Sequence, residues 1–420
     1  MTLINRTEPP SLLPTDRIDF ISPDIHPISS NAKLLHMPKV PNETSRFDLY
    51  FDAGTIRGAK GVASLVNGLL LSGNKDWKSI DIQQQIDNLG GYYDSSISHE
   101  EAYISVHALK ENAIPILKII VDALRQLSFE ENEVEELIRE RKQKLRVNLE
   151  KVNFLAQREF QKKLFSDTDY GNVLEEKDYD AIDRQQLIDF FGTHYLKGLH
   201  KVVVIGDLKP QEIEEIISLI KPFAKDDIPL YETRFKNQPG NFKVEKQGAI
   251  QTALRVGRIL FNKTHEDHLT FQVLNTILGD YFGSRLMSNI REDKGYTYGI
   301  GSMHAELYKT GYFLIATEVG KDESEAALDE IKAELKKLQE EPIDSDELEL
   351  VKNYMLGQML KSADGPYSMM DLYLNVEAYQ MDFDFYNRAI STIHSITSDD
   401  IQSLAKKYLN WEEMTVISAG

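Results

Sequence analysis

The 420-residue sequence contains no cysteine. This absence excludes disulfides, thiolate nucleophiles, and zinc or iron–sulfur sites held by cysteine, so any metal ion would need His, Asp or Glu. Long apolar runs are also missing, because the longest, Val62–Leu71, is too short for a bilayer and is interrupted by Ser64 and Asn67. The start, MTLINRTEPPSLLP, lacks a basic region followed by an apolar stretch. We therefore expect a cytoplasmic protein without a signal peptide or membrane insertion.

Basic residues are scarce relative to acidic ones. Lys and Arg number 48 against 67 Asp and Glu, which gives a net charge of −19. This balance argues against nucleic acid or an anionic membrane surface as the main partner, since both need a basic footprint. Hydrophobic residues at 41% and charged residues at 27% are typical of folded chains and exclude a disordered one. Solubility alone can account for the charge.

Two stretches of the chain repeat the same order of elements. In each, a polar start leads into an amphipathic helix whose apolar residues recur every four positions, from Ile116 and from Ala327. Ser128 and Asp344 each stand three residues before a glutamate, the spacing of a capping box, and predict the start of a second long helix. The apolar stripes of these second helices would be Val134, Ile138, Leu145, Leu149 and Val152 in one copy, and Leu348, Val351, Met355 and Met359 in the other.

The ends of the two copies also agree. A short helix capped by Asp183 or Thr397 precedes a Val/Ile-rich strand in each. Strands also precede the helices, at 47–53, 91–96 and 102–108 in one copy and at 252–257, 298–304 and 312–317 in the other. This order favours an α+β fold of two homologous domains, each an antiparallel-rich sheet packed with helices.

A polar stretch with several prolines separates the copies. It includes Pro222, Pro229, Pro239 and Gly240, a composition typical of an extended linker. We therefore predict an N-terminal domain over residues 1–220, a linker over 221–245 and a C-terminal domain over 246–420.

Residues 274–300, LNTILGDYFGSRLMSNIREDKGYTYGI, carry a resemblance to a known family. The segment is similar to the C-terminal-domain pattern of the insulinase/pitrilysin-type zinc metallopeptidases, nearest the branch of the mitochondrial processing peptidase. The matches are Leu278-Gly279, Ser284-Arg285-Leu286, Ile290-Arg291-Glu292, Lys294-Gly295 and Tyr298. In the other half, residues 61–74, Leu89-Gly90-Gly91 and Tyr170-Gly171 match as well, and the resemblance extends from roughly residue 20 to the end.

The zinc-binding motif of that family is missing. Catalytic members carry His-x-x-Glu-His on the first helix, where two imidazoles one turn apart hold zinc and the Glu acts as general base. Aligned with this pattern, Ser64 stands at the first His, Asn67 at the base and Gly68 at the second His. The further Glu ligand of a later helix would fall near Leu145 or Arg146. The resemblance therefore implies no zinc in this chain.

No other segment restores a catalytic site. His265-Glu266-Asp267-His268 is the best metal-like cluster, but we favour a solvated helix start for it. For His99-Glu100-Glu101, between two strands, we favour a charged hairpin or strand edge. Gly279–Gly283 lacks the Lys-Ser/Thr that follows a phosphate loop, and no Gly-x-Ser-x-Gly elbow occurs.

The resemblance assigns a role to two residues that the chain keeps. In related enzymes an Arg and a Tyr of such a domain act on the substrate: the Arg holds the peptide backbone and the Tyr hydroxyl donates to the carbonyl oxygen as it gains charge. Here these are Arg291 and Tyr298, with Tyr296 close enough to be confused with Tyr298. The alternative is structural, with Arg291 in an ordinary ion pair and Tyr298 packed on a strand.

Two-chain members of the family suggest a function, because one chain carries the zinc and its partner carries the Arg/Tyr pair around an extended peptide. Our first hypothesis is therefore a non-catalytic subunit of a heteromeric zinc endopeptidase, whose partners are a zinc-bearing subunit and a peptide. The second is a scaffold or peptide-binding pseudoenzyme, and a weaker third is a hydrolase with a new site. A homodimer is also plausible, and acidic walls could favour basic peptides.

Overall fold

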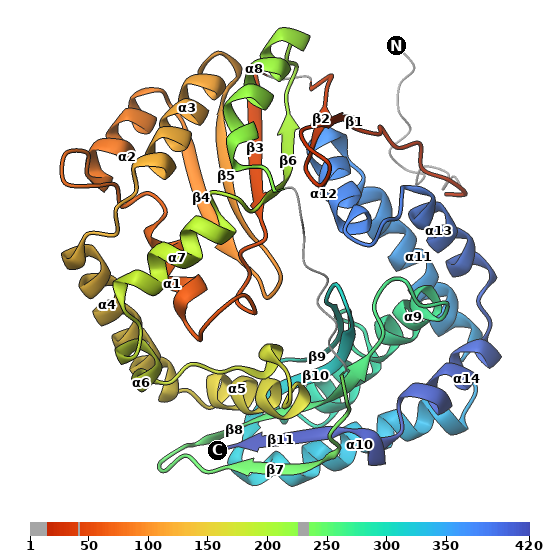
Figure 1. Ribbon diagram of the computed structural model, residues 1–420. Coiled ribbons are helices and arrows are strands. Elements are labelled where there is room, and N and C mark those ends of the chain that lie inside the picture. The colour runs from red at the N-terminus through yellow and green to blue at the C-terminus, as the bar shows by residue number, and fades with distance from the viewer. Residues whose placement is uncertain (1–14, 41–42, 226–234) are drawn as a thin grey trace.

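The computed structural model describes residues 15–40, 43–225 and 235–420 and contains two mixed β-sheets (Figure 1). The sheet of the N-terminal half has six strands in the order β1-β2-β6-β3-β5-β4. Its neighbours are antiparallel except for the parallel pair β2 and β6. The strands are β1 (Asp24–Pro27), β2 (Lys33–Met37), β3 (Thr44–Phe51), β4 (Tyr92–Ile97), β5 (Ala102–Leu109) and β6 (Leu199–Ile205).

The sheet of the C-terminal half has five strands in the order β7-β11-β8-β10-β9, with β7 and β11 parallel. These strands are β7 (Gly240–Val244), β8 (Gln251–Leu260), β9 (Ile300–Glu306), β10 (Gly311–Gly320) and β11 (Thr415–Ala419). In both halves, helices pack on antiparallel-rich sheets. The predicted α+β class with two similar halves is confirmed.

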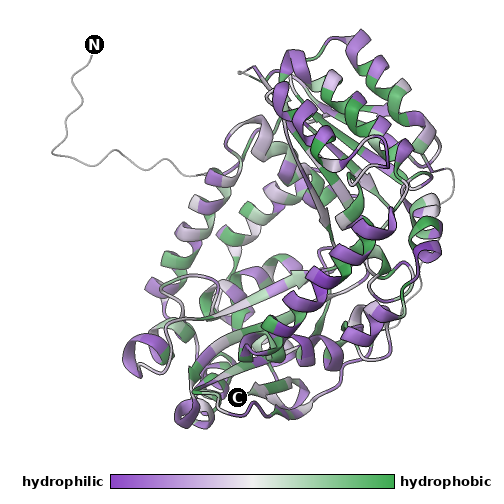
Figure 2. Ribbon diagram, turned by 90° about the vertical axis from the view of Figure 1, so that its left-hand side faces the viewer, coloured by the Kyte–Doolittle hydropathy of each residue, from purple (hydrophilic) through white to green (hydrophobic). Residues whose placement is uncertain are grey.

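Helices cover the outer face of each sheet, with their apolar sides turned inward and their polar sides outward (Figure 2). On the N-terminal sheet, Phe47, Leu49 and Phe51 alternate along β3 and point into the core beneath α1, α3, α7 and α8. The helices of this half are α1 (Val62–Leu69), α2 (Ser79–Asn88), α3 (Lys110–Gln126), α4 (Glu131–Leu149), α5 (Val152–Leu164), α6 (Glu176–Asp180), α7 (Arg184–His194) and α8 (Pro210–Ile220), with short 3₁₀ turns η1 (Asp169–Gly171) and η2 (Lys221–Phe223).

The C-terminal sheet is covered in the same way. Val256, Phe313 and Val416 of its strands pack with α9, α10 and α14 in one apolar cluster. The helices of this half are α9 (His268–Leu278), α10 (Ser324–Glu340), α11 (Ser345–Ser362), α12 (Gly365–Glu377), α13 (Asp384–Ser395) and α14 (Ser398–Tyr408), with the π-helical turn η3 (Met287–Asp293) and the 3₁₀ turns η4 (Lys321–Glu323) and η5 (Trp411–Glu413).

The inner face of each sheet is covered by a helix from the other half (Figure 1). Helix α5 follows the N-terminal helices in the chain but packs on β8 and β11 of the C-terminal sheet, where Phe160 and Leu164 contact Ile417 within one apolar cluster. Helix α12 does the reverse, and Met370 packs against Met37 of β2 and Val203 of β6. The two halves therefore exchange helices, and each completes the core of the other.

The predicted helix caps are confirmed in three of four cases. Asp183, Thr397 and Asp344 each cap a helix through a side-chain oxygen that accepts a backbone N–H. The Ser128 cap is wrong, because its hydroxyl donates to the carboxylate of Glu130 at 2.7 Å instead of capping α4.

The apolar stripe that we assigned to one long helix after Ser128 in fact spans two. Helix α4 ends at Leu149, and Val152 already belongs to α5. A helix break at residues 150–151 therefore lets α5 leave the N-terminal half.

Part of the predicted linker lies outside the described residues, at 226–234. The described parts of 221–245 include η2 and the edge strand β7. The boundary between the two domains stays a prediction. Within the described residues, no helix is both long enough and apolar enough to cross a membrane.

The exchanged helix α5 predicts a large effect of one substitution. The ring of Phe160 is fully buried and lies where a side chain at Gly257 would otherwise stand, 2.9 Å from that Cβ position. We expect Phe160→Ala to lower the free energy of unfolding by about 3 kcal/mol, from lost burial and a residual cavity. Urea unfolding measures this, and Val147→Ala on the exposed side of α4 is the control, with an expected change within about 0.5 kcal/mol. Equal small losses for both variants would contradict the exchange.

Candidate functional site

The positions of the missing zinc motif lie on α1, beside the edge strand β4. Asn67 is 7% exposed, and its Nδ2 donates to the Ser96 carbonyl and to the Tyr195 hydroxyl, both at 3.3 Å. Ser64 is half-buried, and Gly68 is exposed. The amide of Asn67 thus links α1 to β4 and to Tyr195, the residue after α7, at the position where the family places a general base.

Helix α4 approaches α1 at Gly68. A Cβ placed on Gly68 would lie 2.9 Å from Leu137 Cδ2 and 3.2 Å from an Arg141 guanidinium nitrogen. The sequence alignment put the position of the lost glutamate near Leu145 or Arg146, farther along the same helix. Leu145 is buried in the core, and Arg146 pairs with Glu176 of α6. Neither residue can ligate zinc.

These residues do not fit a zinc ion. Zinc is held by imidazole, thiolate or carboxylate groups. Here a hydroxyl, an engaged amide and a glycine stand at the three motif positions, and the glycine faces a guanidinium, which is positively charged. Over residues 15–40, 43–225 and 235–420, no three His, Asp or Glu side chains come close enough to form a metal site.

The second predicted pair lies in the C-terminal half. Arg291 belongs to the π-helical turn η3, and its guanidinium carbon lies 4.6 Å from the ring centroid of Phe282. That distance is within cation–π range, and Phe282 is itself 64% exposed. Arg291 therefore stacks on an exposed aromatic ring, and the part of the chain that the structure describes offers it no carboxylate partner.

Tyr298 is 95% exposed and precedes β9 without belonging to it. Its neighbours fix the loop: the hydroxyl of Thr297 donates to the carbonyl of Glu318 at 2.7 Å, and the hydroxyl of Thr317 donates to the carbonyl of Gly299 at 2.9 Å. These bonds hold the backbone to β10 while the Tyr298 ring projects into solvent. Tyr296, in contrast, packs against the core, which separates the roles of the two tyrosines.

Two sheet edges lie next to these groups. Strand β4 pairs only with β5 and passes α1, and strand β9 pairs only with β10 and follows Tyr298, as far as the described residues show. Each edge presents unpaired backbone groups to which an extended chain can add. The degenerate motif and the Arg/Tyr pair thus lie beside different edges.

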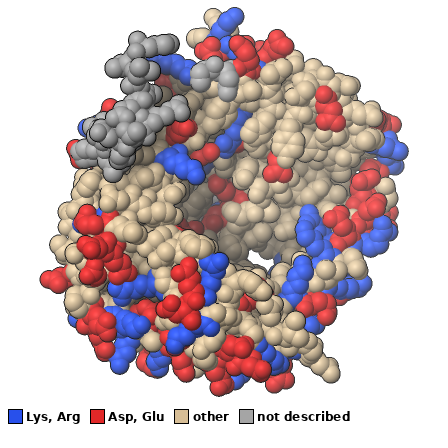
Figure 3. Space-filling model, turned by 180° about the vertical axis from the view of Figure 1, so that it is seen from behind, with Lys and Arg blue, Asp and Glu red and all other residues tan. Residues whose placement is uncertain are grey.

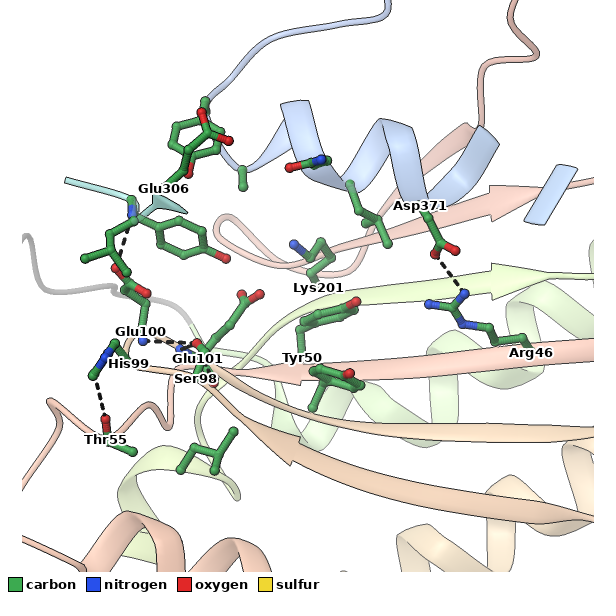
Figure 4. Close-up of a pocket in the computed structure, with 18 residues that line it drawn as sticks. Arg46, Tyr50, Thr55, Ser98, His99, Glu100, Glu101, Lys201, Glu306 and Asp371 are labelled. Atoms are coloured by element: carbon green, nitrogen blue, oxygen red, sulfur yellow. Dashed lines mark hydrogen bonds and ion pairs between the residues drawn. The ribbon is translucent and has the colours of Figure 1, made fainter. Parts of the chain in front are cut away.

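A cavity of about 760 Å³ lies where the two halves meet, and seen from behind the molecule is hollowed there (Figures 3 and 4). Glu100 of the β4–β5 turn accepts from the Tyr170 hydroxyl at 2.9 Å and from the Tyr308 backbone N–H at 3.1 Å. Burial raises the pKa of Glu100 despite these bonds.

Glu101 next to it behaves oppositely. Burial opposes its ionisation, but His200 and Lys201 lower the pKa of Glu101 to about 2. The prediction of a charged hairpin is confirmed, because this segment is the turn between the antiparallel strands β4 and β5. Through Glu100 the turn also contacts Tyr308 of the other half.

The cluster at residues 265–268 does not converge on one point. His268 is 3% exposed, which corrects the expected solvated helix start. The ring of His265 stacks on Phe261, and Asp267 accepts from Lys407 at 2.6 Å. Burial, with the nearby charges of His304 and Lys263, lowers the pKa of His268 to about 3.

Two known protein-family patterns match most of the chain. Residues 35–177 match the family described as "Insulinase (Peptidase family M16)". Residues 181–355 match the family described as "Peptidase M16 inactive domain". The chain belongs to peptidase family M16. The resemblance seen in the sequence is thereby confirmed.

Curated relatives are distant. The chain is 24% identical to an uncharacterized zinc protease of Rickettsia bellii over 70% of this chain and 71% of that protein. It is 22% identical to a protein of Helicobacter pylori named "Non-peptidase homolog YmxG" over 84% and 83% of the two chains. A crystal structure of a peptidase M16 inactive domain from Pseudomonas fluorescens superimposes with a TM-score of 0.87 at 21% identity, covering 95% of this chain and 98% of that one, which confirms the fold.

Two residues beside the site were missed by sequence reasoning. Phe282 lies in the matched segment but its stacking on Arg291 is visible only in space. Arg141 is one of many charges on α4, and only its proximity to Gly68 singles it out.

The buried His268 predicts an acid-dependent loss of stability. Its pKa of about 3 in the fold lies below the ordinary 6.5, so the unfolded chain binds the proton more readily and stability falls as pH drops from 6.5 toward 3. Between pH 6.5 and 5.5 the free energy of unfolding of the wild type should fall by about 1 kcal/mol more than that of His268→Gln. Denaturant titrations at both pH values measure this. An unchanged slope in His268→Gln would refute the assignment.

Proposed function

We propose that this chain is the non-catalytic subunit of a heteromeric zinc metalloendopeptidase in the cytoplasm. It binds peptide substrate and contributes Arg291 and Tyr298 to the active site of a zinc-bearing partner. One contrast carries the proposal. Ser64, Asn67 and Gly68 cannot hold a metal ion, whereas Tyr298 is exposed and the half-buried Arg291 stacks on the exposed ring of Phe282.

The exposure of Tyr298 favours a role toward another molecule. A tyrosine ring buries a large apolar area and normally packs against the protein, yet this one is 95% exposed on a loop tied to β10 by hydrogen bonds. A phenol hydroxyl held there can donate to a carbonyl oxygen as that oxygen gains negative charge. The zinc and the general base come from the partner.

The stacking of Arg291 on Phe282 supports the same role. A guanidinium over an aromatic ring is partly fixed in orientation and keeps its N–H groups free to donate. An extended peptide added to a sheet edge would present backbone carbonyls to such donors. Strand β9 offers that edge directly after Tyr298.

A second candidate is a scaffold or peptide-binding pseudoenzyme. The loss of the motif and the name of the Helicobacter pylori relative favour a non-catalytic protein in either case. The scaffold requires neither Arg291 nor Tyr298 to touch substrate, so substitution of these two residues separates the candidates. A homodimer would be compatible with the scaffold function, but its second copy would supply no zinc.

The proposed subunit role predicts activity only in a mixture. We expect the chain alone to cleave no peptide, and to raise the turnover of a family member from the same genome that carries His-x-x-Glu-His. Tyr298→Phe should lower the turnover of the mixture on the order of 100-fold, the usual effect of removing one donor to a developing oxyanion. Arg291→Ala should weaken it mainly through KM. Cleavage of a quenched fluorescent peptide measures both.

Matched controls make the result specific. Tyr296→Phe changes the neighbouring, core-packed tyrosine, and Arg388→Ala removes an exposed arginine on α13 that pairs with Asp384. Neither should change the turnover. If Tyr298→Phe and Arg291→Ala behave like these controls, the shared active site is wrong and the scaffold is favoured.

A further inference from the structure

The turn that carries Arg291 has an unusual backbone. Element η3 is π-helical, and a backbone bond from the Lys294 N–H to the Asn289 carbonyl at 3.0 Å sets its register. A π-helical turn holds one residue more than an α-helical turn, is rare, and occurs often at functional sites. A return to α-helical pairing would rotate side chains of the turn by up to about 100°, the angle between successive residues of an α-helix. The direction of Arg291 therefore depends on the register of this turn.

One carboxylate of α10 binds both ends of the turn. Glu330 accepts from Asn289 Nδ2 at 3.0 Å through one oxygen, and its other oxygen lies 2.9 Å from Lys294 Nζ. The backbone bond joins these same two residues, and Arg291 lies between them in the chain. The hydrogen bond from Lys294 lowers the pKa of Glu330, as expected for a carboxylate held in its charged form. Glu330 thus holds the turn on both sides of Arg291.

A second carboxylate of α10 binds the same amide. Glu334 is 4% exposed and accepts from Asn289 Nδ2 and from Lys337 Nζ, both at 2.7 Å. A buried carboxylate costs free energy unless it is paired and hydrogen-bonded, and here it is both. Farther along the chain, Tyr296 packs in the apolar cluster that contains Ala327 of α10. Helix α10 therefore fixes this segment before and after Arg291.

We propose that Glu330 is a positioning residue, which holds the π-helical turn in the register that stacks Arg291 on Phe282. This inference rests on the role of Arg291 proposed above and adds the group that sets its direction. The guanidinium carbon lies 4.6 Å from the ring centroid, and among the described residues no carboxylate pairs with Arg291. The turn, and not an ion pair, therefore sets where the guanidinium points. Glu330 itself touches no substrate.

The isosteric variant Glu330→Gln tests this contact at little risk to the fold. A carboxamide has one acceptor oxygen where a carboxylate has two, so glutamine cannot present a separate acceptor oxygen to Asn289 and to Lys294. Asn289→Ala removes the bond from the side of the turn and is a second test. Asp329→Asn is the matched control, because it removes one negative charge from the exposed preceding residue of α10.

Fluorine NMR follows the turn without a partner or a peptide. p-Fluorophenylalanine replaces Phe282, and its resonance reports whether the guanidinium lies over the ring. Arg291→Ala gives the position of the unstacked ring. We expect Glu330→Gln and Asn289→Ala to move the resonance toward that position, and Asp329→Asn to leave it unchanged. If Glu330→Gln leaves the resonance at the wild-type position, the inference is wrong.

The kinetics of the mixture with a zinc-bearing family member test the consequence for substrate. Glu330→Gln should raise KM about fivefold with kcat unchanged, because a displaced guanidinium holds the peptide backbone less well in ground state and transition state alike. In the Arg291→Ala background the same substitution should change KM less than about twofold, since Glu330 acts only through Arg291. Asp329→Asn should leave KM unchanged in both backgrounds. Equal effects of Glu330→Gln in both would indicate a merely structural role and overturn the inference.

The two measurements separate this inference from the proposed function. If Arg291→Ala leaves the KM of the mixture unchanged, the proposed function is wrong, and the fluorine resonance alone then confirms or overturns the hold of Glu330 on the turn. If Arg291→Ala raises KM but Glu330→Gln does not, the proposed function stands and the positioning role of Glu330 is overturned.

Discussion

The exchange of helices α5 and α12 is the constraint on which the structure depends. Each sheet has two apolar faces, since neighbouring residues such as Val202 and Val203 of β6 point into different clusters. The helices that follow a sheet in the chain cover only its outer face. The inner face stays dry because the other half contributes a helix: α5 on β8 and β11, and α12 on β2 and β6. Burial of this area in both directions ties the halves into one body.

That body fixes where the two edges β4 and β9 lie relative to each other. The turns that follow these strands meet at the junction, where Glu100 accepts from the backbone of Tyr308 and from the hydroxyl of Tyr170. One half keeps its sheet edge but has exchanged the ligands of α1 for Ser64, Asn67 and Gly68. The other half keeps an exposed Tyr298 and an Arg291 that stacks on Phe282. The proposed function assigns an extended peptide to this frame and its cleavage to a partner.

Much of the fold could be predicted from sequence periodicity and capping residues. The exchange of helices α5 and α12 between the halves could not. The four-residue spacing from Ile116 and from Ala327 predicted α3 and α10, and Asp183 and Thr397 cap their helices as expected. The stripe of α5, with Phe160 and Leu164, indicates a buried face but carries no information about which sheet buries it. Ser128 failed as a cap because a nearby carboxylate, that of Glu130, competed for its hydroxyl.

The candidate site could also be predicted only in part from the sequence. The fixed spacing of the zinc-binding motif placed its three missing side chains at Ser64, Asn67 and Gly68, within one short helix. Which residues of α4 lie next to Gly68 could not be predicted in this way, because the register between two packed helices is set by side-chain contacts and not by residue count. His268 was expected in solvent, yet the apolar helix that it begins draws it into the core.

The most direct test of the central claim is a cross-link from residue 298 to substrate. The photoreactive residue p-benzoylphenylalanine replaces Tyr298, the protein is mixed with a zinc-bearing family member and a labelled peptide, and the label transferred on irradiation is quantified by gel. The account predicts transfer to this chain only when the catalytic partner is present, and none from the same residue placed at Tyr296. Transfer that is absent, or equal without the partner, would contradict a shared active site.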